Sequence, residues 1–251
     1  MNQSKRFQLL ISIMVALGLW GFLSILGGIA TEGSGLQRVI ELLGGTSRGW
    51  IQVMIYAIFT YSILELLQKR KFIKNQKQSF NLGLLPLQDQ LVLSPDEVAQ
   101  IKLNAIQIER NGQRSLVVDF IKKACTQYRN DNSVSETLQV FNTQVENSKE
   151  EMEGELEMVR YLLGAIISLG FIGTLLGLSS SIGMAHLAKT LEGMPVITRS
   201  LNVAFDTTLV ALLTGLVLNY FYHTYLKEMD TFYSRSKAYV IDNLISRIYK
   251  V

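Results

Sequence analysis

The sequence predicts an all-α, polytopic membrane protein with four transmembrane helices, the last two of which extend into a cytoplasmic helical domain. Two observations lead to this prediction. Only 18% of the 251 residues are charged and 48% are hydrophobic, whereas soluble domains are usually about 25% charged. The charges are also unevenly placed, so that four runs are each long and apolar enough to cross a bilayer, which takes about 20 residues.

The first two spans lie in the N-terminal part of the chain. Residues 7–30 contain no charge, and this run exceeds the roughly 7–15 apolar residues of a signal peptide, so it predicts a retained helix. The second run goes from Trp50 to about Leu67, with Glu65 near its end. We expect residues 1–67 to form a peripheral, lipid-facing layer without buried charges.

The third span begins after Arg160 and continues to about Ala185, and the fourth covers about Val196 to Tyr222. Both runs are apolar over more than 20 residues, so each is long enough to cross the bilayer. Residues 158–222 are therefore predicted to form a pair of transmembrane helices joined by a short loop.

The orientation follows from the basic residues that flank the spans, because Lys and Arg are retained on the cytoplasmic side. They gather before the first span, after the second and after the fourth: Lys5, Arg6, Lys69, Arg70, Lys71, Lys74, Lys77, Lys227, Arg235, Lys237, Arg247 and Lys250. The two other connections are shorter and poorer in basic residues. Both termini and two regions, 68–157 and 223–251, are therefore predicted to be cytoplasmic.

The cytoplasmic region 68–157 is predicted to be helical. Residues 94–97 read Ser-Pro-Asp-Glu, which combines an N-cap, a proline at the first helical position and acids in the first turn. The helix should continue to Ile106 and beyond, and Gly112 should interrupt it before a second apolar pattern begins at Leu116. Residues 82–93 are apolar but interrupted by proline, so we expect a loop there.

Two heptad seams connect the cytoplasmic regions to the last two spans. The first has steps of 4, 3, 4, 7, 4 and 3 and consists of Val134, Leu138, Phe141, Val145, Met152, Leu156 and Val159. The second consists of Leu226, Met229, Tyr233, Val240, Leu244 and Ile248. Such seams are typical of packed helices. We expect one long helix from Val134 through the third span, packed beside a fourth helix that extends into the cytoplasm. Part of the two seams is also a candidate contact with sister subunits.

Several classes of function are not indicated. The net charge of +3 is small and does not point to nucleic acid. The single cysteine, Cys125, cannot form an internal disulfide, and there is no P-loop, GxSxG, HExxH or paired-cysteine pattern. We interpret His186 and His223 as interfacial residues rather than ligands. The sequence therefore predicts no enzyme, no metal and no cofactor.

The third span carries a stripe of small residues, with steps of 3, 4 and 4: Gly170, Gly173, Gly177 and Ser181. Small residues allow transmembrane helices to approach closely, so this stripe predicts helix packing. Thr174 lies on the stripe, and its hydroxyl is expected to face protein or a cavity.

The fourth span contains the consecutive polar residues Asp206, Thr207 and Thr208. Asp206 lies eight to ten residues inside, roughly 12–15 Å at 1.5 Å per residue. An ionisable group in a membrane is costly and usually faces a wet cavity or a polar partner. One threonine alone would more often bond back to its own helix, but an acid and two hydroxyls opposite Thr174 favour an ion pathway.

These two stretches resemble the paired pore-lining helices of the MotA/TolQ/ExbB proton-channel family. The resembling residues are 170–178, Gly-Phe-Ile-Gly-Thr-Leu-Leu-Gly-Leu, and 204–208, Ala-Phe-Asp-Thr-Thr. Thr174 and Thr208 match the threonines of the family. Asp206 does not match the acid of ExbB-like sequences, whose position falls near Val203. The count of four spans is more like MotA, whereas the pore-helix residues are more like TolQ and ExbB.

The resemblance implies a homopentamer in a bacterial inner membrane that encloses two single-span partners of the MotB/TolR/ExbD type, each with a membrane Asp. The complex would be a stator or energiser that converts the flow of protons, or of Na⁺, into mechanical work. Residues 158–222 would then line the pore. A non-conducting oligomeric scaffold or signalling subunit is the alternative, with Asp206 as a buried structural group. Which process such a complex would drive is not indicated.

Overall fold

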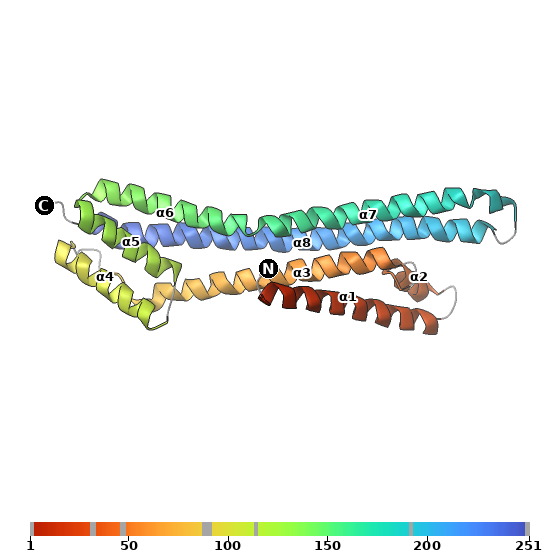
Figure 1. Ribbon diagram of the computed structural model, residues 1–251, viewed down its shortest axis with the longest axis horizontal. Helices are drawn as coiled ribbons and strands as arrows, with labels where there is room; N and C mark the ends of the chain where they lie inside the picture. The colour runs from red at the N-terminus through yellow and green to blue at the C-terminus, as the bar shows by residue number, and fades with distance from the viewer. Residues whose placement is uncertain are drawn as a thin grey trace. The chain divides into compact units, whose positions relative to one another are not determined.

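The computed structural model is helical (Figure 1). It describes residues 3–30, 34–45, 49–86, 92–112, 115–190 and 193–248. Within these residues the regular structure is helical, apart from one isolated parallel bridge between Leu93 and Ile248. This confirms the all-α prediction. Residues 87–91 of the predicted loop and Lys250 of the C-terminal flank lie outside the described residues.

The chain forms two compact units, one from Met1–Leu67 with Glu157–His223 and the other from Gln68–Leu156 with Thr224–Val251. The first unit contains three whole helices, α1 (Gln3–Ile29), α2 (Gly35–Leu42) and α7 (Glu157–Gly183). It also contains the first part of α3 (Trp50–Lys77) and the first part of α8 (Gly193–Asn243). A short 3-10 helix, η2 (Ala185–Lys189), joins α7 to α8.

Four helices in the described part of the chain are long and apolar enough to cross a membrane. They begin at Lys5, Trp50, Val134 and Gly193. The prediction of four spans, of which the last two belong to long helices, is therefore confirmed.

Helix α2 was not among the predicted elements, although it has an N-cap residue. Ser34 caps its N-terminus, since the Ser34 hydroxyl accepts a hydrogen bond from the Gln37 amide at 3.2 Å. Its apolar residues Leu36, Val39, Ile40 and Leu43 follow a helical spacing, but isolated helices of eight residues are unstable. Its position therefore depends on contacts with the rest of the unit.

The first two spans are not free of buried charge, contrary to expectation. Glu65 on α3 is only 7% exposed, and its carboxylate lies 3.8 Å from the Lys5 ammonium on α1. The polar residues Gln8 on α1 and Gln52 on α3 are also buried. The expectation was wrong because hydropathy counts polar residues without showing which side of a helix they occupy.

The second unit contains the rest of α3, then η1 (Gln78–Leu82), α4 (Pro95–Arg110), α5 (Leu116–Asp131), α6 (Val134–Gly154), the end of α8 and η3 (Ile245–Arg247). Helix α4 begins as predicted, because Ser94 and Glu97 form a capping box: the Ser94 amide donates to the Glu97 carboxylate at 2.8 Å, and the Ser94 hydroxyl accepts from the Glu97 amide. Gly112 adopts φ +86°, a left-handed conformation that ends the helix.

Both predicted seams are largely buried. In the first, Phe141, Val145 and Leu156 are at most 3% exposed. The Phe120 ring of α5 packs edge-on against Phe141, with ring centroids 6.3 Å apart, and Tyr233 of α8 donates its hydroxyl to the Ser148 carbonyl at 2.9 Å. Helices α5, α6 and α8 therefore share one core.

The predicted single helix from Val134 through the third span is interrupted by a turn at Glu155 and Leu156. The Leu156 amide bonds to the Glu153 carbonyl, three residues back, at 2.9 Å instead of the α-helical carbonyl four residues back. Gly154 directly precedes the turn, and glycine lowers the helix propensity there. The seam residues on either side of the turn, Leu156 and Val159, are both buried.

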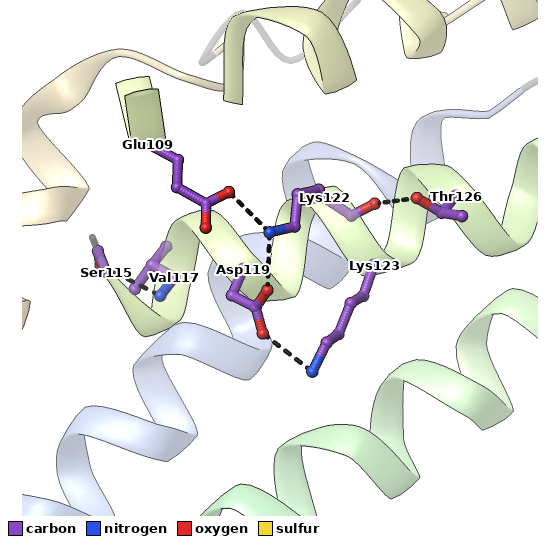
Figure 2. A network of polar contacts seen from close by, with 7 residues as sticks. All are labelled: Glu109, Ser115, Val117, Asp119, Lys122, Lys123 and Thr126. Atoms are coloured by element: carbon purple, nitrogen blue, oxygen red, sulfur yellow. Dashed lines mark hydrogen bonds and ion pairs between the residues drawn. The ribbon is translucent and has the colours of Figure 1, made fainter. Parts of the chain in front are cut away.

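A network of polar contacts holds α4 against α5 (Figure 2). Lys122 lies 2.8 Å from Glu109 and 3.1 Å from Asp119, and Asp119 also lies 2.9 Å from Lys123. Burial opposes the ionisation of Asp119, but the hydrogen bonds from Lys123 and Lys122 outweigh it and lower its pKa. Because these side chains are partly exposed, the network adds little to stability beyond orienting the two helices.

Cys125 on α5 is expected to be unreactive in the folded protein. It is 1% exposed, and burial raises the pKa of its thiol to about 12. Since the thiolate is the nucleophile, its alkylation by N-ethylmaleimide at pH 7.5 should be at least about 100-fold slower than in the denatured chain. Mass spectrometry of the alkylated protein checks this, and rapid labelling of the native protein would contradict it.

Candidate ion-pathway site

The small-residue stripe brings α7 and α8 into backbone contact within the first unit. A side-chain carbon added at Gly177 would lie 2.5 Å from the Ala204 Cβ and 2.8 Å from its Cα. Added carbons at Gly170 and Gly173 would meet Ala211 and Thr207 in the same way. The stripe therefore lies against α8 and leaves no room for larger residues.

Ser181 completes the stripe at its far end. It is 5% exposed, and its hydroxyl donates to the Gly177 carbonyl at 2.9 Å and lies 3.4 Å from the Ile197 carbonyl on α8. A hydroxyl in this place can pack like a small residue because its hydrogen bond is satisfied within its own helix.

The close approach also joins two threonines. The hydroxyls of Thr174 and Thr208 are hydrogen-bonded to each other across the helix contact. The Thr208 hydroxyl also reaches the Gly170 carbonyl on α7 at 3.0 Å, and the Thr174 hydroxyl reaches the Ala204 carbonyl on α8 at 3.2 Å. Each hydroxyl therefore has an acceptor on the opposite helix.

This geometry allows the hydrogen bond between the two hydroxyls to run in either direction. A hydroxyl has one proton to donate and two lone pairs to accept with. In one arrangement Thr208 donates to Gly170 and Thr174 donates to Thr208. In the other, Thr174 donates to Ala204 and Thr208 donates to Thr174. Both arrangements satisfy the two donors and leave lone pairs that can accept from a water or coordinate a cation.

The threonine pair lies at the surface of the unit rather than in its core. Both side chains are partly exposed. They are flanked by exposed apolar residues on both helices, since Phe171 is 62%, Phe205 62% and Leu175 52% exposed. A polar pair on an apolar face is accessible to a neighbouring helix, to water or to an ion.

Thr207 and Asp206 lie elsewhere on the same turn. Thr207 is fully buried, and its hydroxyl donates to the Ala204 carbonyl of its own helix at 2.9 Å. Asp206 lies two positions before Thr208, about 200° around an α-helix, so its carboxylate points away from the threonine pair. The structure brings together Thr174 and Thr208 but not the other two.

The partner of Asp206 is Arg38 on α2, 168 residues away in the chain. Two hydrogen bonds join their side chains, from Nη1 to Oδ2 and from Nη2 to Oδ1, each 2.7 Å long. The hydrogen bond to Asp206 raises the pKa of Arg38 although burial opposes it. Nothing in the local sequence pattern marked Arg38, which lies in the connection between the first two spans.

A polar pocket of about 360 Å³ lies beside this ion pair. It is lined by Ser24, Gly27, Gly28, Gln37, Arg38, Glu41, Gly45, Arg199, Asn202, Val203 and Asp206. Trp50, the first residue of α3, shares a smaller hollow with Ser200 and Val203. Val203, three positions before Asp206, lines both spaces.

Comparison with known proteins agrees with this architecture. Residues 113–237 match the model of the MotA/TolQ/ExbB proton channel family. Neither the curated proteins nor the solved structures include a match to the chain. Members of the family work in oligomers with single-span partner subunits. The matched residues cover about half of the chain and include the stripe and the threonine pair, so this multi-pass membrane protein belongs to the MotA/TolQ/ExbB proton channel family.

Proposed function

We propose that the chain is the channel subunit of an ion-driven motor or energiser. The observation that carries the proposal is the hydroxyl pair of Thr174 and Thr208, which joins two closely packed helices on a partly exposed face. In the proposed complex, five copies place this face around the single helices of two partner subunits. The threonine pairs then form a polar ring in an otherwise apolar lining.

The ring acts on the membrane Asp of the partner. While that carboxylate is charged, it accepts hydrogen bonds from the hydroxyls, which are stronger than bonds between neutral groups. Protonation weakens this contact and releases the ring. One proton crossing about 150 mV yields roughly 3.5 kcal/mol, enough to bias a step between five subunits and two partners.

Proton transfer and sodium coordination place different demands on the ring. The two arrangements of the hydroxyl protons suit a proton pathway, because they interconvert without moving either helix. Hydroxyl and carbonyl oxygens also suit Na⁺, since hard cations prefer oxygen ligands. Protons are the ion that the family suggests, and Na⁺ is the second candidate.

We further propose that the chain lies in a bacterial inner membrane. Both termini and the second unit are then cytoplasmic, as the basic residues that flank the spans indicate. The second unit is then the part of the chain that a cytoplasmic partner can reach. Work outside the membrane would pass through the single-span subunits, because the connections between spans are short.

Asp206 favours a second function, that of a non-conducting scaffold or signalling subunit. Its bidentate contact with Arg38 is what a structural buried acid is expected to make. Exposed apolar residues on α7 and α8, such as Phe171, Leu175 and Phe205, would support an oligomer of this kind as well. Ion flux decides between the two functions.

The test is to isolate the complex with its native partners and measure its subunit ratio and ion flux. Native mass spectrometry is expected to give five copies of this chain and two of a single-span protein. In vesicles with an imposed potential, the complex should accelerate proton entry at least tenfold over protein-free vesicles, read by an internal pH dye. The same assay with a sodium dye tests Na⁺. An intact oligomer that conducts neither ion would contradict the channel and support the scaffold.

A further inference from the structure

Helix α2 is attached to α8 by two ion pairs of opposite polarity. Arg38 of α2 binds Asp206, and Glu41 of α2 lies 3.8 Å from Arg199. Residues 38 and 41 share one side of α2, and residues 199 and 206, seven apart, share one side of α8. The pairing therefore requires a single rotation of α8 about its own axis.

The two pairs differ in strength. Arg38 and Asp206 make two parallel hydrogen bonds of 2.7 Å, and the Asp206 side chain is 6% exposed. The Arg199 side chain is 66% exposed and its contact is 3.8 Å long. A bidentate pair on a buried carboxylate is strong and directional, whereas exposed pairs contribute little. The Arg38 contact thus dominates the attachment.

The turn of α8 that Arg38 holds is the turn that organises the threonines. The Ala204 carbonyl lies within 2.9 Å of the Thr207 hydroxyl and 3.2 Å of the Thr174 hydroxyl. Asp206 leaves the same turn on the opposite side. Rotation of this turn would break the Arg38 contact and the threonine contact together, because both depend on one orientation of the helix.

We propose that Arg38 is a positioning residue for the Thr174–Thr208 pair: by holding Asp206 it sets the rotation of α8 at the ion pathway. This inference rests on the proposed function. It assigns Asp206 to the support of the pathway and explains why the acid is directed away from the hydroxyls.

The pocket beside the pair offers a way to observe the attachment of α2 to α8. The Ser24 hydroxyl is buried at this pocket and has no hydrogen-bond partner among the described residues, which suits an ordered water. Arg38 itself is 44% exposed at its side chain. Loss of the Asp206 contact would therefore loosen α2 and widen access to Ser24.

The functional test compares Arg38→Ala and Asp206→Asn with the exchanged pair R38D/D206R in the intact complex. Each single variant is expected to reduce ion flux at least tenfold, because a displacement of about 1 Å at a reacting group can have such an effect. The exchanged pair should recover flux to within about threefold of the original protein, since it restores an ion pair of reversed polarity. Arg199→Ala is the matched control and should stay within about twofold.

A second measurement reports on the attachment of α2 to α8 and does not depend on ion flux. Ser24→Cys is labelled with a membrane-impermeant thiol reagent, and the buried Cys125 provides a silent background. Labelling should be at least fivefold faster when Arg38→Ala is added and should slow again in the exchanged pair. If Arg38→Ala does not assemble, Arg38→Lys takes its place in the assay. This variant keeps the charge but loses the bidentate geometry, so its labelling rate should be intermediate.

Flux within twofold of the original in Arg38→Ala, or an exchanged pair as inactive as the single variants, would overturn the inference. Its failure is distinguishable from failure of the proposed function. If threonine variants conduct normally, the pathway assignment is wrong; if they are inactive while Arg38→Ala conducts, only the positioning role is wrong.

Discussion

Replacing Thr174 or Thr208 with valine is expected to reduce ion-driven flux by about 30-fold while the complex remains assembled. Valine keeps the shape of threonine but removes the hydroxyl. A hydrogen bond to a charged group contributes about 2 kcal/mol, and a barrier raised by that amount slows a step about 30-fold. The flux of reconstituted vesicles measures the effect, and native mass spectrometry verifies assembly.

Matched variants separate the pathway from helix packing. Thr174→Ser and Thr208→Ser keep the hydroxyls and should retain at least a third of the flux. Thr214, also on α8, bonds only to the Val210 and Ala211 carbonyls of its own helix in the contacts described, so Thr214→Val should stay within about twofold. Normal flux in T174V/T208V would refute the assignment of the pathway.

Gly177→Ala is expected to destabilise the packing of α7 on α8 by about 1–3 kcal/mol, the usual effect of an added carbon in a tightly packed contact. The new carbon would lie 2.5 Å from the Ala204 side chain and 2.9 Å from its backbone nitrogen. Backbone cannot move aside as a flexible side chain can. The helices must separate, so the threonine pair is lost as well, and flux should fall at least as much as in the valine variants.

Two glycines on the same helix serve as controls, because no atom lies within 4 Å of a carbon added at Gly164 or Gly183. Gly164→Ala should be neutral or stabilising, since alanine has the higher helix propensity. The thermal unfolding temperature in detergent compares the variants. Ala204→Gly combined with Gly177→Ala should restore only part of the stability, because the backbone contact remains. Equal unfolding temperatures for Gly177→Ala and Gly164→Ala would contradict the packing described.

The sequence by itself determined the features that depend on neighbouring residues. Four apolar runs were long enough to predict the spans, and the capping residues at Ser94 placed the start of α4 correctly, because hydropathy and N-caps are local properties. The spacing of Gly170, Gly173 and Gly177 was sufficient to place them on one side of a helix, and the structure shows that side against α8.

Only the tertiary structure decided which side of α8 meets which neighbour. Asp206 and Thr208 are almost adjacent in sequence, yet they face different helices, because a helix turns about 100° per residue. The contact with Arg38 joins residues 168 positions apart, a separation that no local pattern bridges. The burial of Glu65 against α1 likewise depends on how the helices rotate when they pack, which no local pattern in a single sequence specifies.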